Sequence, residues 1–104
     1  MIFDPWIEKA WQMYRETECF PNITILKAAL WLEKKHNEAP HYDTAVIISL
    51  HYLVLALRKQ GQGRAILFEY YISRALLWRR QAVSQLAQTI SAEPKLSRHK
   101  PSDI

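Results

Sequence analysis

The chain has 104 residues, of which 49% are hydrophobic, only two are glycine and four are tryptophan, and its net charge is +4. This length and composition predict one globular domain that folds without covalent cross-links. A single cysteine, Cys19, excludes an internal disulfide, no apolar run is long enough for a bilayer, and no signal peptide is recognisable, so we expect a cytoplasmic protein.

The first predicted helix runs from Pro5 to about Glu18. Asp4 suits the N-cap, and Pro5 suits the first helical position, where its missing N–H would have no partner in any case. Apolar residues then recur at helical spacing and define the expected buried face, which consists of Trp6, Ile7, Ala10, Trp11 and Tyr14.

A second helix is predicted from residue 23 or 24 to about His36. Its expected core face consists of Ile25, Ala28, Ala29 and Leu32. Trp31 lies opposite this face, with three lysines at helical spacing around it. The proline-containing segment 37–41 is predicted to form a turn.

Residues 44–57 are apolar with only three polar exceptions, which do not share one helical face. A helix that is apolar all round must be covered all round, so this segment is predicted to be the central helix. We expect Asp43 to be its N-cap and the cations Arg58 and Lys59 to lie at its end. His51 is interpreted as a core residue with one satisfied hydrogen bond.

Segment 61–63 is the predicted joint before one long helix from Arg64 to about Ile90. The apolar stripe of that helix consists of Ala65, Phe68, Ile72, Ala75, Leu76, Val83, Leu86 and Ile90. Arg79 falls at the centre of the stripe, and because a buried unpaired guanidinium is costly it should either reach the edge of the core or face a carboxylate. The helix would be about 40 Å long, so its stripe should outrun the shorter helices.

A second face of the long helix carries a tyrosine, an arginine and a tryptophan, residue types that are enriched at interface hot spots. The predicted partner-binding residues are Leu67, Tyr71, Arg74, Trp78, Arg79 and Trp31. For Trp31 and Trp78, cover by a neighbouring helix of the bundle remains open as the alternative interpretation.

Residues 92–104 contain two prolines and few aliphatic side chains, so we predict a disordered basic tail after a helical domain of residues 1–91. Residues 1–52 hold five Lys or Arg against seven Asp or Glu, a net charge of −2, whereas residues 53–104 hold nine against three, a net charge of +6. A basic half indicates nucleic acid as an alternative partner, although a basic tail and solvated helix faces explain it more simply.

The sequence contains no phosphate-binding glycine loop, no nucleophile elbow and no paired histidines with a neighbouring acid on one helix face. Cys19 has no neighbouring cation that would activate its thiol. Two histidines and two acids lie in residues 36–43, but without the usual spacing of a structural zinc site. We therefore predict that the protein is not an enzyme and has no catalytic residue, metal or cofactor.

These patterns predict an all-α, four-helix bundle-like domain with a long C-terminal helix and a disordered basic tail. The predicted function is that of an adaptor, a chaperone-like protein or an accessory subunit, which binds a partner helix or dimerises through the fourth helix. The alternative is a nucleic-acid-binding regulator that uses the basic C-terminal half.

Overall fold

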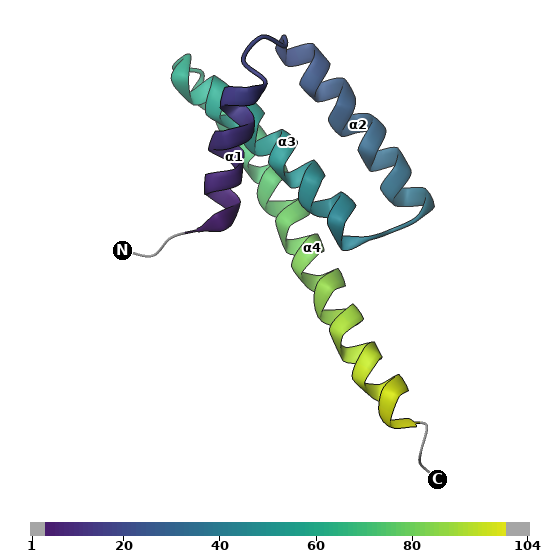
Figure 1. Ribbon diagram of the computed structural model, residues 1–104. Coiled ribbons are helices and arrows are strands. Elements are labelled where there is room, and N and C mark those ends of the chain that lie inside the picture. The colour runs from purple at the N-terminus through teal and green to yellow at the C-terminus, as the bar shows by residue number, and fades with distance from the viewer. Residues whose placement is uncertain (1–3, 100–104) are drawn as a thin grey trace.

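The computed structural model describes the backbone of residues 4–99 and the side chains of residues 4–90. Within these residues the protein is all-α, which confirms the predicted fold class. The four helices are α1 (Pro5–Glu16), α2 (Asn22–Glu38), α3 (Tyr42–Gly61) and α4 (Ala65–His99). Figure 1 shows α1 and α2 on opposite sides of α3, and α4 continuing well beyond the other three helices.

Helix α3 is the centre of the molecule, because it packs against each of the other three helices. Its buried residues are Ala45, Ile48, Ser49, Tyr52, Leu53, Val54, Leu55 and Ala56. The apolar run of the sequence therefore identified the central helix correctly. His51 is half-buried rather than fully buried, and its Nδ1 lies 2.8 Å from the backbone oxygen of Ile47, within the same helix.

Helices α1 and α2 bury only part of their predicted core faces. On α1, Ala10 is fully buried and Trp6 is half-buried, but Trp11 is 41% exposed. On α2, Ile25 and Ala29 are buried as predicted. The most extensive helix–helix contact of the fold is the one between α3 and α4, so these two helices form its central hairpin.

The N-cap of α1 is the residue that the sequence predicts, whereas the N-cap of α3 is a different residue. The Asp4 carboxylate accepts the backbone N–H of Trp6 at 3.0 Å, which confirms Asp4 as the cap of α1. Helix α3 begins at Tyr42, two residues earlier than a cap at Asp43 would allow, and His41 is its N-cap. The Nδ1 atom of His41 accepts the backbone N–H of Asp43 at 3.1 Å, so Asp43 lies in the first turn, where its charge favours the helix dipole.

Arg58 ties the link between α1 and α2 to the end of α3. Its guanidinium donates to the backbone oxygens of Thr17 and Phe20 and to the Asn22 side-chain oxygen. These acceptors are the C-cap residue of α1, a residue of the link and the first residue of α2, so Arg58 satisfies polar groups between the two helices. Helix α1 accordingly ends at Glu16, two residues before its predicted end.

A tight joint connects α3 to α4. Gly63 has a φ of 71°, a left-handed backbone conformation that favours glycine. The backbone N–H of Arg64 donates to the Lys59 oxygen at 2.9 Å, which closes the end of α3. The sequence placed this joint correctly, and it turns α4 back along α3 (Figure 1).

Helix α4 runs to His99, nine residues beyond its predicted end near Ile90. The tail was predicted from its two prolines and few aliphatic side chains. However, a proline biases a helix toward ending and does not dictate the end, and Ala92 and Glu93 are good helix formers. The helical backbone thus enters the segment for which the sequence predicts a disordered tail. Residues 100–104 of that tail lie outside the described residues, and its disorder stays a prediction.

The molecule is elongated, with extents of 61 × 37 × 24 Å, because α4 projects past the other helices. The buried residues that α4 contributes are Ala75 and Ala82. Within the part of the chain that the structure describes, no helix combines the length and the apolar character needed to cross a bilayer.

Candidate interaction surface

One carboxylate joins α2, α3 and α4. The Oε2 atom of Glu33 accepts hydrogen bonds from the Tyr52 hydroxyl at 2.7 Å, the Arg74 guanidinium at 2.8 Å and the Trp78 indole N–H at 3.0 Å. The side chains of Glu33 and Arg74 are 18% and 32% exposed, so this ion pair is partly shielded from water. Charge-assisted hydrogen bonds are stronger in such surroundings. We refer to these four residues as the Glu33 junction.

The junction raises the pKa of two of its members, Tyr52 and Arg74. Burial, together with the hydrogen bond to Glu33, raises the pKa of Tyr52 from 10.0 to about 12. Burial acts to lower the pKa of Arg74, but the hydrogen bonds and charges of Glu33 and Tyr52 outweigh it, and the pKa is raised. At neutral pH the junction therefore holds a neutral tyrosine and a charged arginine.

The Glu33 junction brings part of the predicted binding edge of α4 into contact with α2 and α3. The four residues of that edge are all half-buried: Leu67, Tyr71, Arg74 and Trp78. Two of them bond to Glu33, and the Trp78 ring meets the His36 ring edge-on at 5.0 Å. Of the two interpretations left open for Trp78, cover by a neighbouring helix is the one that the structure shows. The edge is turned inward because α2 docks on that side of the α3–α4 hairpin.

Glu33 itself was missed by the sequence analysis, although a signal was present. It follows Ala29 by four residues and precedes His36 by three, and both of these are buried on α2. A carboxylate on a buried helical stripe requires a hydrogen-bonding or cationic partner, by the reasoning that was applied to Arg79. The same reasoning applied to α2 would have predicted a polar contact between Glu33 and another helix.

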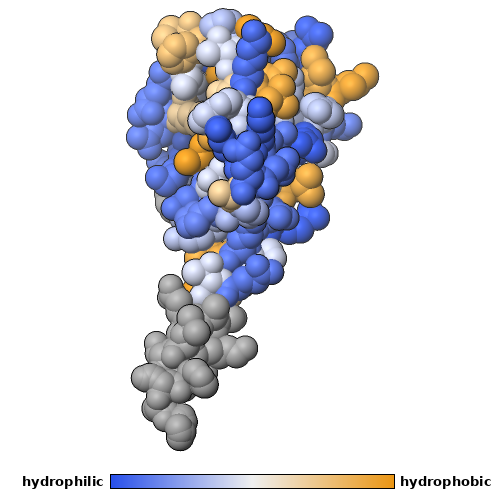
Figure 2. All heavy atoms as spheres, turned by 90° about the vertical axis from the view of Figure 1, so that its right-hand side faces the viewer, coloured by the Kyte–Doolittle hydropathy of each residue, from blue (hydrophilic) through white to orange (hydrophobic). Residues whose placement is uncertain are grey.

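Trp31 lies apart from the Glu33 junction, on the outer face of α2. Its side chain is 58% exposed, and the Lys35 ammonium lies 5.3 Å from the centre of its ring. Figure 2, which views the α2 side of the molecule, shows hydrophilic residues over most of this face, with hydrophobic residues in separate groups between them. Trp31 is therefore an exposed aromatic residue on a mainly hydrophilic surface, and the structure does not bring it together with the predicted residues of α4.

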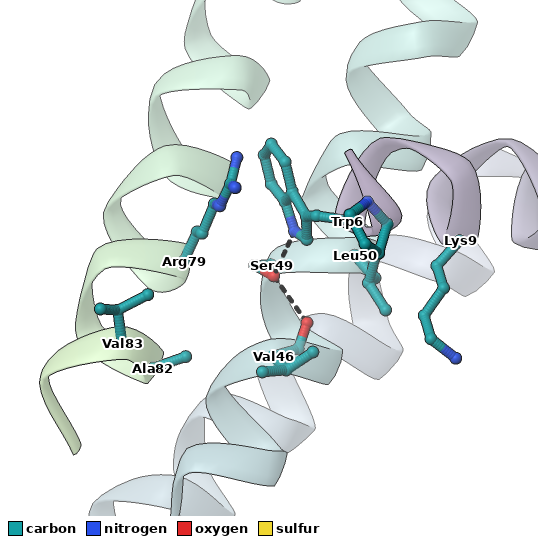
Figure 3. Close-up of a pocket in the computed structure, with 9 residues that line it drawn as sticks. Trp6, Lys9, Val46, Ser49, Leu50, Arg79, Ala82 and Val83 are labelled. Carbon is teal, nitrogen blue, oxygen red and sulfur yellow. Dashed lines mark hydrogen bonds between the residues drawn. The ribbon is translucent and has the colours of Figure 1, made fainter. Parts of the chain in front are cut away.

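Arg79 points to the opposite side of the bundle, toward α1. Its guanidinium pairs with the Asp4 carboxylate at 3.2 Å and lies 4.4 Å from the centre of the Trp6 ring. Figure 3 shows Arg79 and Trp6 extending toward one another from α4 and α1. Of the two environments predicted for Arg79, a carboxylate from another helix is the one observed. The Arg79 side chain nevertheless remains 40% exposed.

A groove of about 240 Å³ opens beside this pair, between α1, α3 and α4. Its lining residues are Pro5, Trp6, Lys9, Val46, Ser49, Leu50, Arg79, Ala82 and Val83. The Trp6 indole N–H donates to the Ser49 hydroxyl at 2.9 Å, and that hydroxyl donates to the Val46 backbone oxygen at 2.6 Å (Figure 3). These polar groups are satisfied within the protein, so the Trp6 groove, as we call it, offers mainly apolar surface and two cations.

An exposed apolar strip continues from the Trp6 groove along α4. Its members and their exposed fractions are Leu76 (42%), Val83 (62%), Leu86 (39%) and Ile90 (56%). A second hollow, of about 280 Å³, lies between Leu76, Arg79, Arg80 and Val83, and it shares Arg79 and Val83 with the Trp6 groove. We refer to Leu76, Val83, Leu86 and Ile90 as the α4 strip. Groove and strip together form a continuous surface that α1, α2 and α3 leave uncovered.

The residues considered for metal binding or nucleophilic chemistry do not converge. His36 is buried against Trp78 and Gln85, whereas His41 caps α3 and stacks on Tyr42. Among the described residues, no group of three or more His, Cys, Asp or Glu side chains is placed to hold a metal ion. Cys19 is an exposed free thiol in the link between α1 and α2.

Comparison with known proteins adds no family to this description: no protein-family model, no curated protein and no solved structure matches the chain.

Proposed function

We propose that this chain is a protein–protein interaction module, an adaptor or accessory subunit without catalytic activity, that seats a partner helix along α4. The observation that carries the proposal is the α4 strip, whose residues are 39% to 62% exposed. Soluble proteins rarely leave a contiguous apolar surface uncovered unless it has a binding role. The strip also adjoins a groove, and concave apolar surfaces favour binding.

The spacing of the strip supports a helix as the bound element. Leu76, Val83, Leu86 and Ile90 follow one another at intervals of seven, three and four residues. Such a stripe on one helix packs against the apolar stripe of a second helix, with side chains of each fitting between those of the other. The strip belongs to one continuous helix, so it would present a straight ridge to its partner.

Light scattering after gel filtration, followed by affinity capture and mass spectrometry, tests the proposal. We compare the wild type with Val83→Glu, on the strip, and with the matched control Ile66→Glu at the other end of α4. Both positions are exposed, at 62% and 84%, so neither variant should unfold. We expect a complex with the wild type and with Ile66→Glu, and its loss with Val83→Glu. A chain that remains alone in all three cases, or complexes that all three variants form equally, would refute the proposal.

A second candidate function, binding of single-stranded nucleic acid, is favoured by the surroundings of Trp31. An exposed tryptophan beside cations suits base stacking combined with phosphate attraction, and Lys35 lies next to the Trp31 ring. This function predicts binding of an RNA or DNA oligomer that weakens steeply with salt and is lost in Trp31→Ala. Binding that Trp31→Ala leaves unchanged would exclude the α2 face as the nucleic-acid site.

A further inference from the structure

We infer that the occupant of the Trp6 groove and the α4 strip is an acidic amphipathic helix of another protein. The inference rests on the proposed function and names the chemistry of the partner. Three observations carry it: the charges that border the apolar surface, the partial pairing of Arg79, and the length of the strip.

The residues that line the Trp6 groove and the adjoining hollow include three cations and no acid. Lys9 and Arg79 line the Trp6 groove, and Arg80 lines the adjoining hollow. Helix α4 has no Asp or Glu from Tyr70 to Ala92, and the single acid of α3, Asp43, lies in its first turn. A ligand with negative charges beside its apolar stripe would therefore complement both the shape and the charge of this surface.

Arg79 is the group best placed to receive a carboxylate from the partner. A guanidinium has five N–H donors arranged in a planar fork, which suits carboxylate groups. Among the described residues its acidic partner is Asp4, at 3.2 Å, and its side chain is 40% exposed. Trp6 covers one side of the guanidinium and holds it at the edge of the groove. A second carboxylate can bind there without breaking the pair with Asp4.

The length of the strip sets the size of the partner element. From Leu76 to Ile90 a helix rises by about 21 Å, which is about four turns. A partner helix of about 15 residues would cover this length. Its expected pattern is an apolar stripe with a spacing of three and four residues, flanked by Asp or Glu.

A second copy of the chain fits this surface less well. Its own α4 strip would bring no acid to Lys9, Arg79 and Arg80, because α4 has no Asp or Glu from Tyr70 to Ala92, and these cations would lack a complementary charge in such a dimer. Nucleic acid would satisfy the cations but would leave the α4 strip uncovered. The ring of Trp6, the aromatic residue of the groove, is stacked against Arg79, which limits its use as a platform for bases.

Peptide selection provides the test. A phage library displays helical peptides with one apolar stripe, and Glu and Lys are equally frequent at the flanking positions. The library is selected on the wild-type chain and counter-selected on Val83→Glu. Selected peptides are then synthesised and measured against Lys9→Glu/Arg80→Glu, and against the control Lys27→Glu/Lys34→Glu, which changes the net charge equally on exposed positions of α2.

We expect the selected peptides to carry more Glu than Lys, and to bind Lys9→Glu/Arg80→Glu at least about tenfold more weakly than the control variant. Peptides that require Val83 but show no excess of Glu, or that bind both charge variants equally, would refute the inference and leave the proposed function standing. Recovery of no Val83-dependent peptide would refute both. Self-association that Val83→Glu abolishes, or displacement of the peptides by an RNA oligomer at physiological salt, would identify a different occupant.

Discussion

Each side of α4 combines an acid, an arginine and a tryptophan, but the two sets of residues have different surroundings. On the α2 side, Glu33, Arg74 and Trp78 form a half-buried junction in which one carboxylate oxygen receives three donors. On the α1 side, Asp4, Arg79 and Trp6 also combine an acid, an arginine and a tryptophan, but the ion pair is 31% and 40% exposed and borders a groove. The first set closes a contact between helices, whereas the second leaves a surface open.

The difference follows from where α1 and α2 dock. Glu33 lies inside α2, in the second turn from its end, and the contact between Gln85 and His36 continues the packing of α2 along α4. Asp4 is the N-cap of α1, so the helix begins there and covers little of α4. Residue composition alone therefore cannot distinguish a covered junction from an open one. In this molecule the two differ in the position of the acid, which lies inside α2 in one case and at the start of α1 in the other.

Removing the charge of Glu33 should have the largest effect on stability. Glu33→Gln keeps the shape of the side chain but leaves Arg74 without a counter-charge, which we expect to lower the free energy of unfolding by about 3 kcal/mol. The free energies of unfolding of the wild type and of Glu33→Gln are measured by urea unfolding, which is followed by circular dichroism. A loss below about 1 kcal/mol, as is typical of an exposed pair, would mean that the two sides of α4 do not differ.

The stability of the junction should also fall at alkaline pH. Because the pKa of Tyr52 is raised from 10.0 to about 12, the folded state holds the proton more tightly than the unfolded state. The stabilising contribution of this proton is complete below pH 10 and is lost as the pH rises through 12, by as much as about 3 kcal/mol. Unfolding measured across this range should show a steeper loss in the wild type than in Tyr52→Phe. If the wild type and Tyr52→Phe lost stability equally with rising pH, the alkaline effect would not come from Tyr52.

Replacing the junction tryptophan should have a smaller effect. Trp78→Phe loses the hydrogen bond to Glu33 and part of the packing on His36, which together should cost about 2 kcal/mol. The matched change Trp6→Phe removes the hydrogen bond to Ser49 from a more open site and should cost less. Thermal unfolding of both variants makes the comparison, and a larger loss for Trp6→Phe would reverse the roles of the two sides.

Asp4→Asn should have the smallest effect. Asparagine caps a helix about as well as aspartate, so only the exposed ion pair with Arg79 is lost, which should cost less than about 1 kcal/mol. The comparison with Glu33→Gln is direct, because each change replaces one carboxylate by its amide. Equal losses for the two variants would show that burial does not separate the two pairs.

The sequence predicted the elements of this fold better than their docking. The apolar run at residues 44–57, the Asp4 cap and the joint at Gly63 all identified features that the structure contains, because each depends on local chain chemistry. Hydrophobic periodicity also placed Arg79 within the apolar stripe, where it had either to reach the edge of the core or to face a carboxylate, and the structure pairs it with Asp4. Periodicity does not give the side on which a neighbouring helix packs. It therefore could not decide whether Trp78 lies on a free edge or is covered by a neighbouring helix, as the structure shows.

The exposed strip could be anticipated only in part. The excess length of α4 over α1 and α2 indicated that some of its apolar stripe would remain uncovered, and the exposure of Val83 and Ile90 agrees with that expectation. The groove beside the strip could not be foreseen, because it depends on the angle at which α1 crosses α3 and brings Trp6 toward Arg79. Long-range geometry of this kind is not encoded in local spacing.

The most direct test of the difference between the two sides is a paired measurement on Arg74→Gln and Arg79→Gln. For each variant, the free energy of unfolding is measured together with the affinity for a peptide that the wild type binds through Val83. We predict that Arg74→Gln loses stability and keeps its affinity when folded, whereas Arg79→Gln keeps its stability within about 1 kcal/mol and binds the peptide at least about tenfold more weakly. Unchanged affinity in Arg79→Gln, with weakened binding in folded Arg74→Gln, would contradict the assignment of the binding surface to the α1 side of α4.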